Sequence, residues 1–161
     1  MQNKKIFRRK ILILGSYAVG KTSLTRFFVE GTFINEYLST IGVNIKHKNI
    51  SHQDYELNLL IWDIADIVTH QNIPDTYLKG AHGILLVYDV TRENTLNRII
   101  AEQTGFFQKN PDLPTIIVGN KTDLLEGEKP EEDSFTDIYT SAKTGENVEQ
   151  AFQLLIEKMI V

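Results

Sequence analysis

The chain has 161 residues and contains no cysteine. Disulfide bonds and zinc sites with thiolate ligands are therefore excluded, and the sequence as written offers no thiol for prenylation or palmitoylation, so we expect no lipid anchor in it. It also lacks any apolar run of the roughly 18 residues that a membrane-spanning helix needs. The absence of cysteine fits a reducing compartment, and we expect a cytoplasmic protein that a partner can recruit to membranes.

Basic charge is also in short supply, with 17 Lys and Arg against 21 Asp and Glu and a net charge of −4. A general nucleic-acid binder would be basic, so no nucleic-acid partner is expected. The one basic cluster is either the solvated entrance of a strand or a contact for an anionic surface; it comprises Lys4, Lys5, Arg8, Arg9 and Lys10. The hydrophobic content of 42% is ordinary for a globular protein, and the length predicts a single domain over residues 1–161.

Short apolar runs rich in Ile, Leu and Val alternate with longer helical patterns, which is typical of an α/β protein with a mostly parallel sheet. The predicted strands are Phe7–Leu14, Val43–Ser51, Tyr55–Asp63, Gly83–Asp89, Thr115–Gly119 and Thr136–Thr140. The second and third strands are separated by His52–Asp54 alone and should form an antiparallel hairpin. The predicted helices are Thr22–Val29, Thr91–Lys109 and Glu146–Val161.

A complete phosphate-binding pattern follows the first predicted strand and leads into the first predicted helix. It consists of Gly15, Ser16, Tyr17, Ala18, Val19, Gly20, Lys21, Thr22 and Ser23. Glycines at both ends let the backbone turn so that its N–H groups face an anion, and the helix N-terminus adds further donors. Lys21 can reach the β- and γ-phosphates, and the Thr22 hydroxyl can ligate Mg²⁺. The chain is therefore expected to bind a nucleoside triphosphate or diphosphate.

Two motifs that follow later predicted strands indicate which nucleotide base the chain binds. Asp123, within the segment Asn120-Lys121-Thr122-Asp123, has a carboxylate that can accept hydrogen bonds from both N1–H and N2–H₂ of guanine. Adenine would leave it unpaired at a cost of about 1–3 kcal/mol. Asn120 can bind a neighbouring loop or the N7 side of guanine, and the stem of Lys121 can lie against the base. The second motif, Ser141-Ala142-Lys143, can direct the Ala142 N–H to the guanine O6.

At this point the chain resembles the Ras superfamily of small GTPases, most closely its Rab branch, over nearly its whole length. The resemblance is carried by Gly15–Ser23, Ser39–Val43, Trp62-Asp63, Gly80–Thr91, Gly119–Leu124 and Thr140–Lys143. It implies a P-loop G domain with a six-stranded sheet whose second strand is antiparallel, GTP or GDP and Mg²⁺ as ligands, and two switch regions. Those regions would contact protein effectors and regulators and would make the chain a nucleotide-dependent switch.

The resemblance also implies roles for single residues. Thr40 would ligate Mg²⁺ and meet the γ-phosphate, and together with Lys21 it would serve the hydrolysis step. Asp63 would hold Mg²⁺ through water, Phe33 would pack on the base, and Tyr37 would cover the phosphates. For three of these positions a simpler interpretation stays open: Phe33 as a packing aromatic, Tyr37 as a surface residue, and Asp63 as a strand cap.

The sequence departs from the family in the second switch, where the usual D-x-A-G-Q reads Asp63-Ile64-Ala65-Asp66-Ile67. Isoleucine cannot hold the attacking water, and loss of one such preorganised group typically costs about 10²–10³ in rate. Tyr17 stands where the family often has a small residue, beside the expected γ-phosphate. We therefore expect slow hydrolysis; the alternative is that Tyr17 turns outward and another side chain positions the water.

A second departure is a shortening between Asp123 and Ser141, where the family has a full helix. Only Leu124–Ser134 is available for it, which is too short for an ordinary helix, although Pro130 can open a single turn. We expect the nearby sheet face to be partly bare, with Phe135 and Ile138 reaching the surface and a partner or self-association there. The alternative is that Leu124 and Leu125 fold back and seal the gap.

Three functions remain open from the sequence. The first is a regulatory switch that exchanges GDP and GTP. The second is a module that binds guanine nucleotide and hydrolyses it barely or not at all. The third, an ATP-using P-loop enzyme, is disfavoured by Asp123, which selects guanine.

Overall fold

The computed structural model describes residues 3–35, 40, 42–65, 73–130 and 132–160, with only the backbone of 102–107. Three residues singled out above, Tyr37, Asp66 and Ile67, lie outside the described residues. No helix in the described ranges is long and apolar enough to cross a membrane.

The described strands form one six-stranded sheet in the order β2-β3-β1-β4-β5-β6. The strands are β1 (Lys5–Gly15), β2 (Val43–Ser51), β3 (Tyr55–Ile64), β4 (Gly83–Asp89), β5 (Thr115–Asn120) and β6 (Ile138–Tyr139). Every neighbouring pair is parallel except β2 with β3, which run antiparallel from Val43 opposite Ile64 to Ser51 opposite Glu56. The predicted mostly parallel sheet and its hairpin are confirmed.

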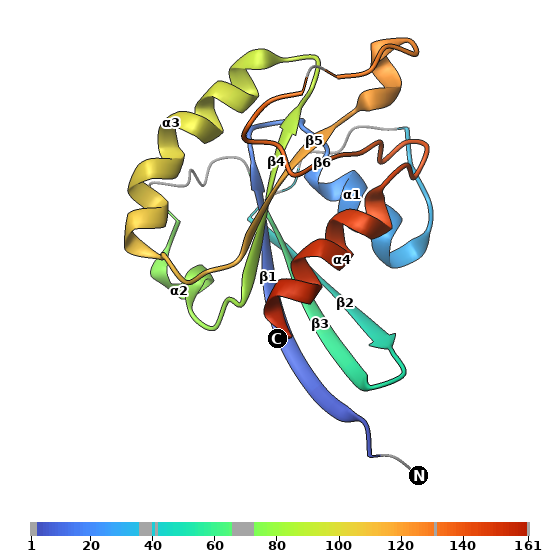
Figure 1. Ribbon diagram of the computed structural model, residues 1–161, viewed down its shortest axis with the longest axis vertical. Helices are drawn as coiled ribbons and strands as arrows, with labels where there is room; N and C mark the ends of the chain where they lie inside the picture. Colours follow the sequence, from blue (N-terminus) through green and yellow to red (C-terminus); the bar gives the residue numbers. More distant parts are fainter. Residues whose placement is uncertain (1–2, 36–39, 41, 66–72, 131, 161) are drawn as a thin grey trace.

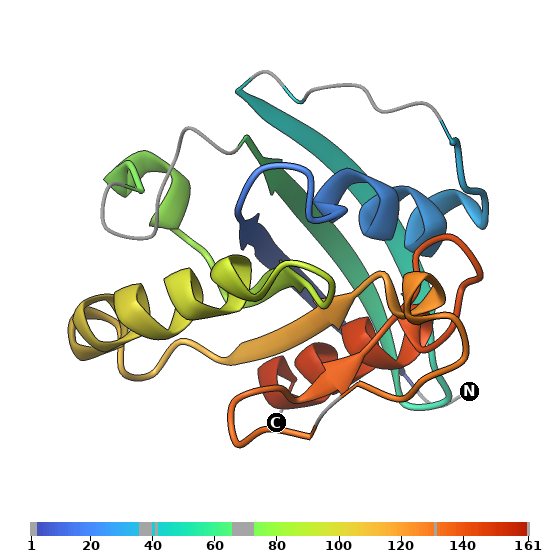
Figure 2. The ribbon, with the colours of Figure 1, turned by 90° about the horizontal axis from the view of Figure 1, so that it is seen from above.

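Helices cover both faces of this sheet, with α1 and α4 on one side and α2 and α3 on the other (Figure 1, Figure 2). Their bounds are α1 (Lys21–Glu30), α2 (Asp75–Leu78), α3 (Glu93–Lys109), the 3₁₀ turn η2 (Thr122–Leu125) and α4 (Val148–Met159). Two hydrophobic clusters result, one on each face of the sheet. On the first, the rings of Phe28 and Phe152 stack with centroids 3.9 Å apart, so α1 and α4 are held together by aromatic packing.

Two helices begin later than the periodicity predicts. Helix α3 begins at Glu93 rather than Thr91, because the Thr91 N–H and hydroxyl both donate to the Asp89 carboxylate in a turn. Helix α4 begins at Val148 because Asn147, with φ of 57°, interrupts the helical backbone before it.

The last strand is shorter than Thr136–Thr140, because the Ile117 N–H donates to the Asp137 carboxylate (2.7 Å) instead of to a ladder carbonyl. Neither α2 nor η2 was expected, since four-residue elements leave almost no periodic signal.

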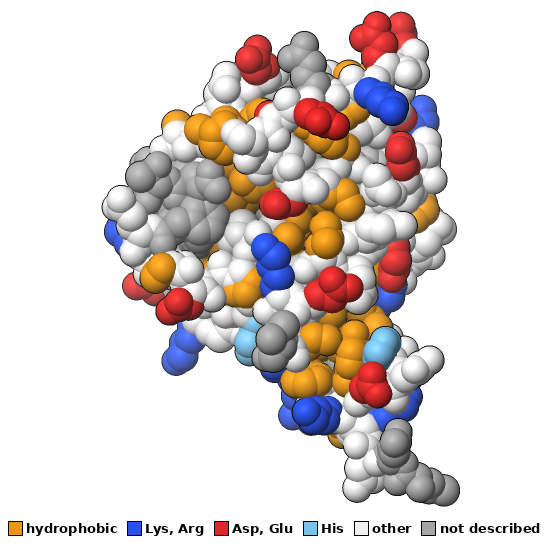
Figure 3. Space-filling model, in the orientation of Figure 1, with side chains coloured by type: hydrophobic (Ala, Val, Ile, Leu, Met, Phe, Trp, Pro, Cys, Tyr) orange, Lys and Arg blue, Asp and Glu red, His pale blue; other side chains and the backbone are white. Residues whose placement is uncertain are grey.

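The segment after η2 contains no helix among its described residues, so the predicted shortening is confirmed, although the single turn lies at Thr122–Leu125 rather than at Pro130. Phe135 is 42% exposed, as expected, but Ile138 is half-buried and packs on the first cluster. Leu124 is 53% exposed, so it does not fold back to seal the gap. Acidic side chains surround the tip of this segment, at the upper right of Figure 3.

The sheet face beside the shortened segment is nevertheless covered. Ile117 and Tyr88 are each 4% exposed, so the expected bare face is wrong at these positions. The hydroxyl of Tyr88 contacts that of Thr136 at 2.8 Å, and Thr136 in turn donates to Asp133 at 2.7 Å. Aromatic rings capped by a polar network therefore replace the missing helix. The predicted self-association remains a prediction, with the exposed ring of Phe135 as its support.

Asp133 organises this network. Its carboxylate accepts from the N–H groups of Phe135 and Thr136, both at 2.7 Å, and from the hydroxyl of Tyr139 at 3.1 Å. Desolvation raises the pKa of Asp133, but the hydrogen bonds from Thr136, Phe135 and Tyr139 outweigh it and hold the pKa below its ordinary value. A charged Asp133 is therefore the form that the fold stabilises.

Replacing Asp133 with alanine removes the acceptor for these donors, and the segment should loosen. We expect the free energy of unfolding to fall by about 1 kcal/mol and amide hydrogen exchange of Phe135 and Thr136 to accelerate. The matched control is Glu132→Ala, which removes a neighbouring exposed carboxylate. Equal exchange rates in the parent and in Asp133→Ala would show that the network does not hold the segment.

Candidate functional site

The loop between β1 and α1 depends on glycine at both ends. A Cβ on Gly15 would lie 2.1 Å from the Val87 carbonyl oxygen of β4, so the loop passes too close to the sheet for any side chain. Gly20 has φ of 101°, and a Cβ there would lie 2.3 Å from the Asn120 side-chain nitrogen. The close approach to β4 and β5 thus gives both glycines a steric reason beyond turn formation.

Lys21, the first residue of α1, follows this loop and is only 8% exposed. Its ammonium group donates to the carbonyl oxygens of Gly15 (2.8 Å) and Ser16 (3.0 Å). The charge is therefore held against the loop, next to the backbone N–H groups at the start of α1. A phosphate that enters the loop meets a cation and a helix N-terminus together.

The residues expected to hold Mg²⁺ are brought together from three segments. The Thr22 hydroxyl contacts the Thr40 hydroxyl at 2.7 Å and donates to Asp63 Oδ2 at 2.5 Å. Asp63 is fully buried at the end of β3, and its other oxygen, Oδ1, has no hydrogen-bond partner among the described residues. Burial raises the pKa of Asp63, against the opposing effects of the Thr22 hydrogen bond and of Lys21 and Arg26.

This donor set fits a hard divalent cation. Two hydroxyls and one carboxylate supply oxygen ligands, which Mg²⁺ prefers, and a cation would neutralise a carboxylate that burial otherwise penalises. No group of three His, Cys, Asp or Glu that would suit a metal occurs within the described part of the chain. A search for clusters of acidic or imidazole ligands therefore misses this site, because two of its three oxygen donors are threonine hydroxyls.

Lys21, Thr22 and Thr40 line a pocket of about 320 Å³. Most of the predicted residues line it: Tyr17, Ala18, Gly20, Lys21, Thr22, Ser23, Phe33, Thr40, Asn120, Lys121, Asp123, Ala142 and Lys143. Arg26, Ile34, Asn35, Ala65 and Leu124 line it as well and were not predicted. Gly15, Ser16, Val19, Asp63 and Ser141 are not in its lining. Val19 is fully buried in the hydrophobic core, so its side chain supports the loop and does not face the pocket.

Asn120 joins the two ends of the pocket. Its amide nitrogen donates to the Val19 carbonyl at 3.0 Å, and its oxygen accepts from the Thr140 hydroxyl at 3.0 Å. The same oxygen accepts from the Ala142 N–H at 3.2 Å. Of the two partners considered for Asn120, the neighbouring loop is the one observed. The Ala142 N–H expected at the guanine O6 is directed to Asn120 in this structure.

Asp123 is oriented by the residue that follows β6 and Thr140. The hydroxyl of Ser141, which is fully buried, donates to Asp123 Oδ1 at 2.7 Å. Asp123 itself is half-buried and faces the pocket. Ser141 therefore acts on the pocket through Asp123 and not by lining it.

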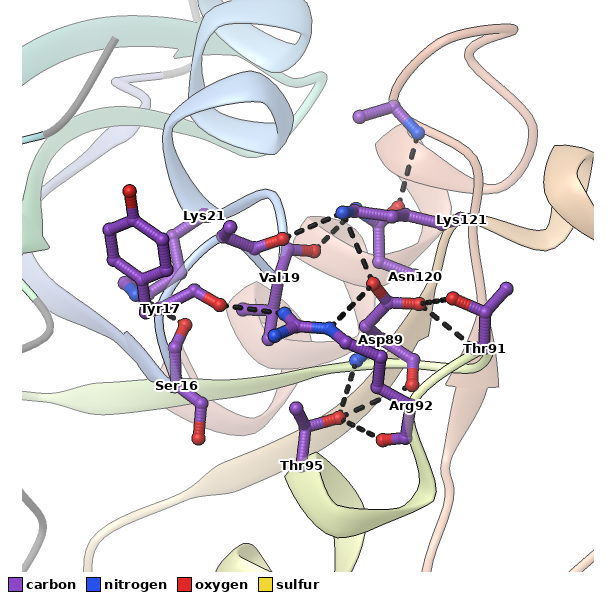
Figure 4. A network of polar contacts seen from close by, with 12 residues as sticks. Ser16, Tyr17, Val19, Lys21, Asp89, Thr91, Arg92, Thr95, Asn120 and Lys121 are labelled. Atoms are coloured by element: carbon purple, nitrogen blue, oxygen red, sulfur yellow. Dashed lines mark hydrogen bonds and ion pairs between the residues drawn. The ribbon is translucent and has the colours of Figure 1, made fainter. Parts of the chain in front are cut away.

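Sequence reasoning assigned no role to Asp89, which is 2% exposed at the end of β4. Its Oδ2 contacts Lys121 Nζ at 3.1 Å and Arg92 Nε at 3.2 Å. Each cation then reaches the phosphate loop: Lys121 donates to the Ala18 carbonyl and Arg92 to the Tyr17 carbonyl, both at 2.6 Å (Figure 4). The sequence feature that could have indicated this role is a single Asp that ends an otherwise uncharged strand.

The charge state of Asp89 follows from these contacts. Burial raises its pKa, but hydrogen bonds from Thr91 and the hydrogen bond and charge of Lys121 outweigh burial, and the pKa lies below its ordinary value of 3.8. The carboxylate is thus ionised when the site is assembled. Tyr17, whose backbone it holds through Arg92, has a side chain that is 50% exposed at the rim of the pocket.

Replacing Asp89 with asparagine should leave Lys121 and Arg92 without a counter-charge and lower the free energy of unfolding by about 1–3 kcal/mol. The folded pKa is depressed, so this stabilisation is present above pH 3.8 and is lost as the pH falls through the folded value. Urea unfolding of parent, Asp89→Asn and the exposed control Asp112→Asn at neutral and acid pH measures both effects. A loss no larger than that of the control would contradict the assignment.

Comparison with known proteins agrees with this geometry. The family model described as Ras family matches residues 10–161. A Ras-related protein Rab-18 of Lymnaea stagnalis is 35% identical over an alignment that covers 94% of this chain and 80% of that protein. RABD2a of Arabidopsis thaliana is 36% identical over 91% of this chain and 77% of its own length. Rab-18-B of Danio rerio is 38% identical over 94% and 78%.

The family match extends from the middle of β1 to the end of the chain, and it contains the phosphate loop, the threonine and aspartate oxygens and the Asn120–Asp123 motif. The chain therefore belongs to the Ras family of small GTPases and is similar to its Rab members.

Proposed function

We propose that this chain binds GTP and GDP with Mg²⁺ and acts as a molecular switch that hydrolyses GTP slowly. The observation that carries the proposal is the Asp123 carboxylate, fixed by Ser141 at one end of a pocket whose other end holds Lys21. A single pocket thus offers an acceptor for a base and a cation for phosphates.

Selection of guanine rests on the remaining acceptor capacity of Asp123. One of its oxygens already accepts from Ser141, which fixes the plane of the carboxylate. Guanine offers two adjacent donors to a carboxylate, whereas adenine would leave it buried and unmet, at a cost of about 1–3 kcal/mol. The half-buried ring of Phe33 and the stem of Lys121 lie at the same pocket and are proposed to pack on the base.

At the phosphate end, Lys21 and the N–H groups of α1 would hold the β- and γ-phosphates, and Thr22, Thr40 and Asp63 would hold Mg²⁺ directly or through water. When bound, the cation neutralises charge on the phosphate oxygens. Hydrolysis in this class needs little covalent chemistry from the protein and depends on positioning and on charge stabilisation. Lys21 and Thr40 would supply both on the protein side.

Slow hydrolysis is inferred from the sequence of the second switch. Ile67 stands where the family has the water-orienting glutamine, and an alkyl side chain has no donor or acceptor for water. From its place in the sequence, Asp66 is expected to add negative charge near an anionic substrate. Tyr17 at the pocket rim narrows the space through which a partner's arginine would enter. The second candidate, a guanine-nucleotide-binding module that does not hydrolyse, is favoured by the same residues.

Effectors and regulators are proposed to bind through the two switch regions, in the manner of a nucleotide-dependent switch. The related proteins are named as Rab proteins, and by that likeness a role in vesicle transport is proposed for this chain.

Asp123→Asn should shift the preference from guanine to xanthine nucleotides, because an amide donor then faces the position of the base amino group. We expect the affinity for GDP to fall at least about 100-fold and the affinity for xanthosine diphosphate to rise. Titration of both nucleotides against parent, Asp123→Asn and the nearby exposed control Glu126→Gln tests this. Equal affinity of the parent protein for ATP and GTP would contradict the proposed function.

Ile67→Gln should restore a group that can orient water and speed single-turnover GTP hydrolysis by about 10²-fold. The control is Ile45→Gln, which makes the same change at a 44% exposed position on β2, outside the lining of the pocket. A parent rate equal to that of ordinary family members would show that another residue positions the water. Unchanged hydrolysis in Ile67→Gln, with GTP still bound, would favour the non-hydrolysing module.

A further inference from the structure

A second concave site lies on the other half of the sheet, where β1 extends with the β2–β3 hairpin beyond the helices (Figure 1). It is a groove of about 290 Å³, and the described residues in its lining come from β1, β2 and β3 and from His82, just before β4. We call it the basic groove; the argument uses Arg8, Lys10, His47, Asn49, Asn58 and Leu60. Nothing in the proposed nucleotide switch uses these residues.

Strand register explains how the groove is built. Across the three strands, Arg8 of β1 lies opposite Asn58 of β3, which lies opposite Asn49 of β2. One step along, Lys10 lies opposite Leu60, which lies opposite His47. Because side chains alternate along a strand, these two rows face the same side of the sheet. Half-buried Leu60 forms an apolar floor, with cationic and amide groups around it.

The charge of the groove has one sign. No Asp or Glu is among its lining residues, although the chain as a whole carries a net charge of −4. Neighbouring cations are engaged: Lys4 pairs with Glu56 at 3.0 Å, and Lys10 donates to the Lys79 carbonyl at 2.9 Å. In contrast, the side chains of Arg8 and His47 make no hydrogen bond or ion pair with any described residue, and both are exposed.

The amides of Asn49 and Asn58 likewise have no partner among the described residues. The groove therefore presents one guanidinium, one imidazole and two amides, all available to a ligand, around an apolar floor. These groups match carboxylates beside an apolar side chain.

The groove is separate from the nucleotide pocket. The two share no lining residue, and between them on the same sheet face lies Trp62, whose ring is covered by Lys10 at 3.7 Å and meets the ring of Tyr77 edge-on. Because β1 and β3 are each paired with a strand on both sides, we expect Arg8, Asn58 and Leu60 to keep their positions in both nucleotide states. A ligand of this groove should thus not distinguish GDP from GTP.

We propose that the basic groove binds an acidic peptide segment of a partner protein, with an apolar side chain of that segment packed on Leu60 and its carboxylates on Arg8 and His47. The proposal commits to a peptide because the apolar floor lies recessed among the strands, where a side chain reaches it and a lipid headgroup layer does not. The negative net charge of the chain opposes nucleic acid.

The probe is a fluorescein-labelled peptide of Glu-Glu-Leu repeats, with a Lys-Lys-Leu peptide as its charge-reversed counterpart. Fluorescence anisotropy is measured with the full chain loaded with GDP and with a non-hydrolysable GTP analogue. We expect the acidic peptide alone to bind, equally in both loaded states, and to bind less tightly as salt is added. Binding restricted to the GTP-analogue form would overturn the proposal, since a switch surface would then be responsible.

Arg8→Glu should weaken the acidic peptide at least about tenfold, and so should Asn58→Glu, which places a carboxylate beside Arg8 in the same row. Lys158→Glu changes the net charge by the same amount as Arg8→Glu, at an exposed position on α4. It is the matched control and should have little effect on peptide binding. Guanine-nucleotide affinity should be unchanged in all three variants, which separates this test from the proposed switch. If Lys158→Glu weakened binding of the acidic peptide as much as Arg8→Glu does, the effect would be due to net charge alone, and the proposed site would be overturned.

Two other occupants are tested in parallel. Sedimentation with phosphatidylserine vesicles asks whether a lipid surface is the true ligand, and light scattering over a concentration series asks whether a second copy of the chain is. Vesicle binding or self-association that Arg8→Glu abolishes, in the absence of binding to the acidic peptide, would overturn the assignment to a partner peptide.

Discussion

The candidate site depends on one buried amide. Asn120, 1% exposed at the end of β5, bonds the phosphate loop through Val19 and the loop after β6 through Thr140 and Ala142. Three segments that are distant in the chain thus share one side chain whose donor and acceptor are both satisfied. Because an unmet buried polar group costs about 1–3 kcal/mol, each segment is held in position by the other two, and the pocket keeps its two ends at a fixed distance.

Two buried carboxylates near this amide differ in whether a cation of the protein pairs with them. Asp89 is ionised between Lys121 and Arg92 and ties both to loop carbonyls. Asp63 is the opposite case, since its burial disfavours the charge and, within the part of the chain that the structure describes, one oxygen lacks a hydrogen-bond partner. The first carboxylate supports the fold by itself, whereas the second is in an environment that a cation would improve. This contrast separates a structural acid from a candidate ligand more clearly than either sequence position does.

The same sheet carries two chemically different ends. At the carboxyl ends of the parallel strands, loops and helix N-termini gather around the pocket, as is usual in open α/β sheets. At the other end, long β1 and the hairpin run past the helices and expose one face with its register intact. The proposed peptide site at this end is built from strand side chains, in the rows of Arg8 and Lys10.

By itself, the sequence determined the sheet, its one antiparallel pair and the chemistry of the pocket, because apolar runs and motifs such as Gly15–Ser23 act over a few neighbouring residues. It could not determine how the shortened segment is closed, because Tyr88 and Asp133 are 45 positions apart (133 − 88) and are joined through the hydroxyl of Thr136. The role of Asp89, the direction of the Ala142 N–H and the pairing of Arg8 with Asn58 were decided by tertiary structure for the same reason. Each depends on which strands lie side by side, and the local periodicity of a sequence does not predict strand neighbours.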